Sequence, residues 1–302
     1  MTSLGNWTFV PYPSFLPTVF ANTALWNVSN AVKQKEYQIQ ISWPFKWESR
    51  EVAKPALAMY LLDGNALGMT ASEAFKRRNE VEFAQPDSVV VSIGYPLTDT
   101  VYGLTQRAVD FRPPIPSPEN ITAGADDFIE FIDEVLRPWV HDTVFPSVEF
   151  TREALYGHSW GGIFTIWALI TRPDWFDTFF SVSPAVYWNN GSILDVVTEK
   201  LGNGTVGSGS TPETEAKPKF FLGYGALEQF PVRRRTETEE AFQQRKSIIQ
   251  SFQMTDYSHE LFYRIEGSKR MKDVQLREYA GQDHFGAASS AITEGIDYFL
   301  DW

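Results

Sequence analysis

The chain has 302 residues, of which 43% are hydrophobic, and a formal net charge of −12. This length and hydrophobic content suffice for a large buried core, and we expect a single domain over residues 1–302. The acidic balance argues against nucleic acid and anionic membranes as partners, because both require a basic face. The absence of cysteine excludes disulfides, thiolate catalysis and cysteine-ligated metals.

The N-terminal residues carry neither the basic region nor the apolar region of a signal peptide. No apolar run reaches the 18 or so residues that a membrane-spanning helix needs. The sequence therefore predicts a cytoplasmic protein without a membrane span.

The first half of the chain contains three predicted strands. Residues 36–43 alternate apolar and polar side chains, as a half-buried strand does. Residues 56–62 and 88–94 are continuous apolar runs, which are typical of central strands buried on both faces. Residues 99–118 contain four prolines and are predicted to form a loop.

A long helical pattern occupies residues 122–144, with Phe128, Phe131, Ile132 and Val135 on one face. Pro138 lies inside it and is expected to kink or end the helix, because proline lacks a backbone donor.

The second half of the chain continues the alternation of strands and helices, and the Gly- and Ser-rich segment 202–217 is predicted to be a surface loop. We expect strands at 154–156, 178–184, 219–224, 260–265 and 274–279, and helices at 162–170, 236–255 and 285–300. Such alternation predicts an α/β fold with a mostly parallel central sheet and helices on both faces.

The pentapeptide Gly157-His158-Ser159-Trp160-Gly161 has the form G-x-S-x-G. It follows a predicted strand and precedes an apolar helix. This strand–turn–helix arrangement holds a serine hydroxyl above the sheet in α/β-hydrolases, so Ser159 is the candidate nucleophile.

A serine hydroxyl needs a base, which follows the nucleophile in the chain order of α/β-hydrolases. The chain has four histidines. His141 precedes the serine, His158 is expected to point away from Ser159, and His259 lies in a polar stretch between a predicted helix and strand. His284 follows the last predicted strand, where the loops of such sheets carry ligand chemistry, and is the candidate base.

The base in turn needs an acid that holds its tautomer. Glu228 comes just after the predicted strand 219–224 and is the best candidate. Asp283 is a weaker rival, because adjacent side chains rarely reach each other's ring nitrogen. Asp256 and Glu260 are more remote alternatives.

An oxyanion hole requires backbone N–H groups aimed at the developing alkoxide. The residue after the nucleophile, Trp160, supplies one, and Asn65 in the loop after 56–62 is expected to supply the other. Arg107, Tyr187 and Trp188 are candidate substrate contacts. The chain has no H-E-x-x-H, Walker A or G-x-G-x-x-G motif, so neither a metal nor another cofactor is expected.

Several short segments together resemble the esterase D-like branch of the α/β-hydrolases, over roughly residues 33–300. They are Tyr60-Leu61-Leu62-Asp63-Gly64-Asn65, Ser92-Ile93-Gly94-Tyr95, Arg107-x-x-Asp110, Gly157-His158-Ser159-Trp160-Gly161-Gly162 and Ser181-x-Ser183-Pro184. Within this branch the chain looks most similar to siderophore esterases, both the bacterial enterobactin type and the fungal triacetylfusarinine C type.

The resemblance implies serine-dependent hydrolysis of carboxylic esters. The implied substrate is a small molecule, a cyclic tri-ester hydroxamate siderophore cleaved in its iron-loaded form inside the cell.

Three other functions stay open at this point. A general carboxylesterase of the feruloyl or S-formylglutathione type would use the same residues, although the N-terminal pattern and cysteines of the latter are missing. A hydrolase fold can also act as a non-catalytic ligand-binding protein. An acyl transferase would use the same nucleophile with an acceptor other than water.

Overall fold

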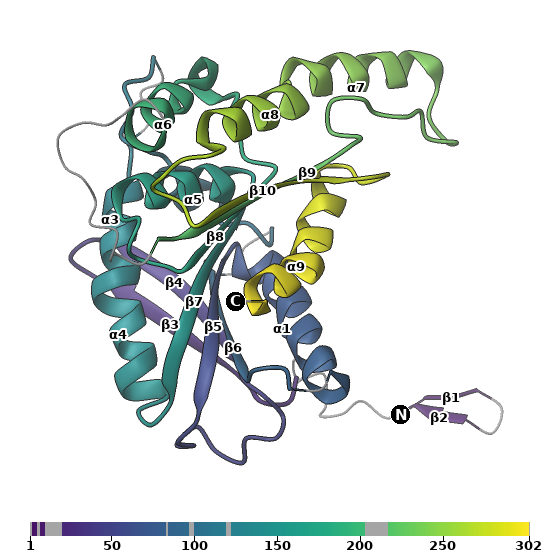
Figure 1. The fold of residues 1–302 in the computed structure, drawn as a ribbon. Coiled ribbons are helices and arrows are strands. Elements are labelled where there is room, and N and C mark those ends of the chain that lie inside the picture. The colour runs from purple at the N-terminus through teal and green to yellow at the C-terminus, as the bar shows by residue number, and fades with distance from the viewer. Residues whose placement is uncertain are drawn as a thin grey trace.

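The computed structural model describes residues 2–4, 7–9, 20–82, 84–96, 100–118, 122–202 and 217–301. An eight-stranded sheet lies at its centre, in the order β10-β9-β8-β7-β5-β6-β4-β3 (Figure 1). Its strands are β3 (Thr23–Asn30), β4 (Lys35–Ser42), β5 (Pro55–Leu62), β6 (Ser88–Gly94), β7 (Glu149–His158), β8 (Thr178–Val182), β9 (Lys219–Gly225) and β10 (Asp273–Tyr279).

The sheet is mostly parallel. β4 pairs antiparallel with both β3 and β6, and all other neighbours in this sheet are parallel. The carboxyl ends of β5 to β10 therefore meet at one edge of the sheet. A separate antiparallel pair joins β1 (Thr2–Leu4) and β2 (Trp7–Phe9).

Helices cover both faces of the sheet, which confirms the predicted fold class. They are α1 (Gly64–Val81), α2 (Leu104–Asp110), α3 (Ala125–Glu130), η1 (Phe131–Leu136), α4 (Arg137–Trp139), η2 (Val140–Val144), α5 (Trp160–Thr171), η3 (Trp188–Gly191), α6 (Ile193–Leu201), α7 (Glu239–Ser251), α8 (Met254–Ile265) and α9 (His284–Leu300). α1 and α9 pack against one face, and α5 and α8 against the other (Figure 1). None of the described helices combines the length and apolar character that crossing a bilayer requires.

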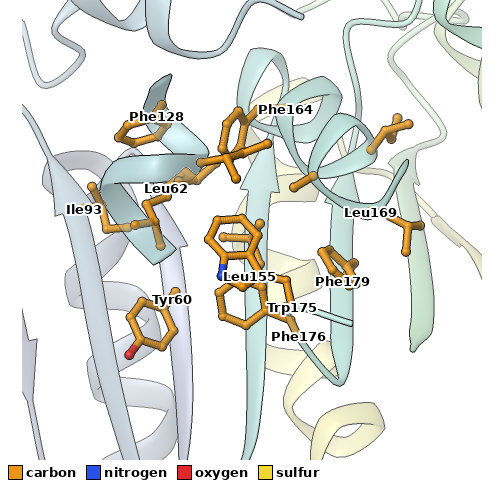
Figure 2. Close-up of a cluster of buried hydrophobic side chains, with 14 of the residues drawn as sticks. Tyr60, Leu62, Ile93, Phe128, Leu155, Phe164, Leu169, Trp175, Phe176 and Phe179 are labelled. Carbon is orange, nitrogen blue, oxygen red and sulfur yellow. The ribbon is translucent and has the colours of Figure 1, made fainter. Parts of the chain in front are cut away.

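The buried side chains form two layers, one on each side of the sheet. Alternate residues of a strand enter opposite layers, as Leu61 and Leu62 of β5 do. Figure 2 shows part of the larger layer, where Phe164 and Leu169 of α5 lie in one cluster with Leu155 and Phe179 of the central strands. This packing fixes α5, and with it the turn at Ser159, against the sheet.

The helical segment from Ala125 to Val144 runs through Pro138 without ending there, so the proline does not stop the helix. The segment passes into π-helical turns at η1 and η2, on both sides of the proline. A π turn shifts each acceptor by one residue, so the chain can continue where proline supplies no donor.

The prediction of a strand at 260–265 is wrong, because these residues belong to α8. The buried residues of α8 are Met254, Ser258, Leu261 and Ile265, whose spacing of three or four is helical. The predicted helix 236–255 ends earlier, at Ser251 of α7. The predicted loop 99–118 contains α2, and residues 203–216 of the predicted loop 202–217 lie outside the described residues.

Candidate active site

Ser159 occupies a tight turn between β7 and α5. Its backbone has φ of 59° and ψ of −116°, an unusual conformation for a residue with a side chain. Two backbone hydrogen bonds hold the turn: Ser159 N donates to Val182 O (2.9 Å), and Ala185 N donates to Ser159 O (3.1 Å). A Cβ at position 157 would lie 2.0 Å from the carbonyl oxygen of Gly161, so glycine is required there. The strained turn keeps the half-buried Ser159 at the carboxyl edge of the sheet.

The structure brings His284 and Glu228 together at the same edge. His284 begins α9 and Glu228 follows β9, and His284 Nδ1 lies 2.6 Å from Glu228 Oε2. The other carboxylate oxygen accepts hydrogen bonds from Ser183 Oγ (2.5 Å) and Gly225 N (2.6 Å). Three donors therefore converge on the buried Glu228 carboxylate, which is the arrangement that orients an imidazole for proton transfer.

The three rival carboxylates have other partners. Asp283 is the N-cap of α9, where its side chain accepts a hydrogen bond from Gly286 N (3.0 Å). Asp256 accepts from the Gln229 side chain (2.7 Å), and Glu260 pairs with Arg264 (2.5 Å). Among the described residues, Glu228 is therefore the carboxylate that contacts the His284 ring.

His158 has a role that the sequence did not indicate. It is buried, its Nε2 lies 2.8 Å from the backbone oxygen of His284, and the two rings are 4.4 Å apart. Burial lowers the pKa of His158 well below its usual value, so the ring is neutral. Since a carbonyl can only accept, Nε2–H of His158 donates and ties the nucleophile turn to the start of α9.

The two candidate oxyanion donors both lie in the first turn of a helix. Asn65 is the second residue of α1 and Trp160 the first residue of α5, where backbone N–H groups lack an intrahelical acceptor. The Asn65 side chain bonds both to Tyr95 N (2.9 Å) and to Tyr95 O (2.9 Å), which fixes this loop against β6. Two helix N-termini at one sheet edge favour negative charge between them.

Arg107, an expected substrate contact, pairs with a buried carboxylate in the structure. Its side chain is 9% exposed and forms a two-point ion pair with Asp63, at 2.5 Å (Nε to Oδ1) and 2.7 Å (Nη2 to Oδ2). Burial raises the pKa of Asp63, and the guanidinium of Arg107 opposes that rise. A guanidinium committed to a buried carboxylate favours a structural role over substrate binding.

A cavity of about 450 Å³ opens beside Glu228 and His284. Most of its walls are apolar or aromatic, and they come from Tyr187, Leu227, Pro231, Val232, Ile249, Phe252, Met254 and Phe285. Tyr187, one of the expected substrate contacts, stacks on Phe252 with ring centroids 4.6 Å apart. The cavity therefore offers an apolar wall next to the candidate base.

Trp188, the other aromatic residue expected to contact substrate, is only 4% exposed. Its ring packs against Trp160 at 5.7 Å, and the Arg112 guanidinium lies 5.2 Å from both ring centroids. This burial favours a supporting role beneath Trp160 over direct contact with a substrate.

Comparison with known proteins agrees with this fold. The family model described as "Putative esterase" matches residues 29–275, and the chain belongs to this esterase family of α/β-hydrolases. It is an ester hydrolase, which confirms the resemblance to the esterase branch.

The chain is 38% identical to a siderophore enterobactin esterase of Emericella nidulans, over 97% of both chains. It is 34% identical to a siderophore triacetylfusarinine C esterase of Aspergillus fumigatus, over 88% of this chain and 89% of that protein. The solved structure of the siderophore hydrolase EstA from Aspergillus nidulans superposes with a TM-score of 0.86, at 36% identity and 98% coverage of both chains.

Proposed function

We propose that this protein is a serine esterase that hydrolyses the ester bonds of a cyclic tri-ester siderophore in its iron-loaded form. The observation that carries the proposal is the hydrogen bond between His284 Nδ1 and Glu228 Oε2 at the sheet edge that carries the Ser159 turn. The names of the relatives above support the choice of substrate class.

In the proposed reaction, Ser159 Oγ attacks the ester carbonyl carbon while Nε2 of His284 takes its proton. Glu228 accepts the hydrogen bond from Nδ1–H and stabilises the imidazolium that forms. The N–H groups of Asn65 and Trp160 bind the oxyanion of the tetrahedral intermediate. Collapse breaks the bond to the alcohol oxygen, which receives the proton from Nε2, and leaves an acyl ester on Ser159. Water repeats these steps and releases the acid.

With a cyclic substrate, the first step of this reaction releases no separate product. Attack on one ester opens the ring, but the leaving alcohol stays joined to the acyl group through the rest of the chain. The enzyme must therefore hold a large opened molecule until water attacks. The cavity beside His284 and the exposed Phe285 at its edge supply apolar surface for that purpose.

The charge of the site favours a hydroxamate complex over a catecholate complex. Three hydroxamates neutralise one ferric ion, whereas three catecholates leave a triply negative complex. The cavity walls include Arg234 and Arg245, but Arg245 pairs with Glu237 (2.7 and 2.8 Å) and Asp283 is also part of the lining. With a chain charge of −12, this lining suits a neutral complex better than a trianion.

Ring opening would assist iron release, because it removes the pre-organisation that gives a cyclic ligand part of its affinity. We infer that this occurs in the cytoplasm, where freed iron can be used. Immunoblots of fractionated cells of the source organism test this point, and recovery of the protein only outside the cytoplasmic fraction would contradict it.

The decisive experiment incubates the enzyme with an iron-loaded cyclic tri-hydroxamate ester and follows the products by mass spectrometry. We expect linear products with wild type, none above background with Ser159→Ala, and wild-type behaviour with the exposed control Ser49→Ala. An iron-loaded cyclic tri-catecholate is tested in parallel and should react more slowly.

Two other results would redirect the proposal. Hydrolysis of p-nitrophenyl acetate, feruloyl or S-formylglutathione esters without any activity on tri-ester siderophores would leave a general carboxylesterase. Binding of the iron complex without hydrolysis of any ester would leave a ligand-binding protein.

A further inference from the structure

The buried pair of Asp63 and Arg107 contacts both loops that carry the candidate oxyanion donors. Asp63 precedes α1 by one residue, and its backbone oxygen accepts hydrogen bonds from Ala66 N (2.9 Å) and Leu67 N (3.1 Å). It therefore caps the helix turn that presents Asn65 N–H. Its φ of 53° is a left-handed conformation that residues with side chains seldom adopt.

The same pair also contacts the nucleophile turn. Nη2 of Arg107 lies 3.5 Å from the backbone oxygen of His158, the residue before Ser159. Oδ2 of Asp63 lies 3.6 Å from the position that a Cβ would take at Gly161, so the carboxylate rests against the first turn of α5. Asp63 and Arg107 thus lie between the end of β5 and the end of β7.

We propose that the Asp63–Arg107 pair is a positioning device that sets the separation and direction of the Asn65 and Trp160 N–H groups. Neither side chain is assigned a contact with substrate. The inference rests on the proposed function insofar as it needs an oxyanion to form at Ser159. It does not depend on which ester is the natural substrate.

The geometry of the guanidinium is what such a device requires. Two parallel N–H···O bonds fix both the distance and the plane of the carboxylate, whereas a lysine ammonium fixes only a distance. The side chains of both residues are almost wholly buried, so water cannot replace a lost contact easily. A small change in this pair would therefore shift the end of β5 relative to α5.

A buried ion pair can also serve stability alone, and the chain offers a matched control for that role. Arg137 pairs with Glu153, and its guanidinium lies 4.9 Å from the ring centroid of Phe176 in the larger core layer. Glu153 lies on β7 five residues before His158, roughly 16 Å along the strand. Both are largely buried arginine–carboxylate pairs, although Arg137 also pairs with Asp133 and Glu153 also contacts His141. Of the two, the Asp63–Arg107 pair is the one that contacts the Ser159 turn.

The test compares Arg107→Lys with Arg137→Lys. Hydrolysis of p-nitrophenyl acetate gives kcat and KM, and phenylboronic acid, which forms a tetrahedral adduct with an active serine, probes the oxyanion site. Loss of one oxyanion donor typically costs a hundred- to a thousand-fold in rate, so a misaligned donor should cost roughly ten- to a hundred-fold. We expect Arg107→Lys to lower kcat by that factor with KM nearly unchanged, and to weaken boronate inhibition in parallel.

Arg137→Lys should lower the melting temperature and leave kcat and boronate inhibition at the wild-type level. The double variant Asp63→Asn with Arg107→Gln removes both buried charges but keeps hydrogen-bonding side chains. This double variant replaces Arg107→Lys in the test if Arg107→Lys does not fold, and we expect it to show the same loss of kcat and of boronate affinity.

Wild-type kcat and boronate inhibition in a folded Arg107→Lys or double variant would overturn the positioning role. Equal losses of kcat in Arg107→Lys and Arg137→Lys would also overturn it, because a general loss of stability would then explain both. The Ser159→Ala variant separates this inference from the proposed function: full activity there would remove the serine mechanism itself.

Discussion

Replacing Glu228 by glutamine should trap the His284 ring in the wrong tautomer. The carboxylate oxygen Oε1 accepts from Gly225 N (2.6 Å) and Ser183 Oγ (2.5 Å), while Oε2 faces His284 Nδ1 (2.6 Å). Gly225 N–H can only donate, so the amide oxygen of glutamine must take the Oε1 position. Its NH2 group then faces Nδ1, which has to accept a hydrogen bond and lose its proton.

The consequence can be expressed as a rate. With the proton on Nε2, His284 cannot take the proton of Ser159, so the reaction depends on a rare tautomer. An equivalent change in a Ser-His-Asp triad lowers kcat about ten-thousand-fold, which is roughly 5 kcal/mol of transition-state stabilisation. We expect Glu228→Gln to lose between about a hundred- and ten-thousand-fold in kcat, towards the upper end of that range.

The assay is p-nitrophenyl acetate hydrolysis, with Ser159→Ala as the background and thermal melting to confirm the fold. Glu228→Asp keeps a carboxylate and should retain more activity than Glu228→Gln. Asp283→Asn is the matched control, because Asp283 caps α9 and has no hydrogen bond to the ring in the described structure. Near-normal turnover of Glu228→Gln together with a crippled Asp283→Asn would refute the assignment of the acid.

Other positions give independent tests. Gly157→Ala should lower the melting temperature strongly, because the added Cβ would lie 2.0 Å from Gly161 O. Gly161→Ala is the control, since its Cβ meets only ordinary contacts from 3.5 Å and the variant should melt near wild type. Equal shifts of the two melting temperatures would contradict this reasoning. Burial lowers the pKa of His158 in the folded state, so below about pH 6.5 the unfolded chain binds a proton that the folded chain does not. The free energy of unfolding therefore decreases as the pH is lowered, by up to about 1.4 kcal/mol per pH unit. Denaturant unfolding between pH 7.5 and 5 should show that dependence reduced in His158→Gln, and an unchanged slope would exclude His158 as its source. Tyr187→Ala removes one wall of the cavity and should raise KM for an iron-loaded tri-ester about ten-fold, with little change in KM for p-nitrophenyl acetate. An unchanged KM for both substrates would argue against this cavity as the binding site.

The sequence was most informative where a single local pattern fixes the geometry. The turn around Ser159 needs glycine at 157 and an apolar helix after it, and both are visible in the residues. Glu228 and His284 could be proposed from their places just after predicted strands, because parallel strands bring their carboxyl ends to one edge.

The sequence was less informative where distant segments determine a side chain's surroundings. Arg107 looks like a cation available to a substrate until α2 places it against Asp63, which is 44 residues earlier. Trp188 likewise follows a strand end, but it is buried under Trp160. The contact of His158 with the backbone of His284 depends on α9 lying against β7, so no local sequence pattern predicts it.

Helix and strand were confused at residues 260–265, where the aromatic and β-branched side chains have a high strand propensity. Leu261 and Ile265 are four residues apart and are buried with Met254 and Ser258, so packing of one helical face decided the structure. Short apolar runs of this kind fit either period.

The most direct test of the central claim is the detection of an acyl intermediate on Ser159. The enzyme is mixed with an iron-loaded cyclic tri-hydroxamate ester, quenched in acid within the first turnover, and examined by intact-mass and peptide-mapping mass spectrometry. Because ring opening loses no fragment, we predict an adduct with the full mass of the metal-free siderophore on the peptide that contains Ser159, and none in Ser159→Ala. Turnover of the siderophore without such an adduct, or an adduct on another residue, would contradict the account.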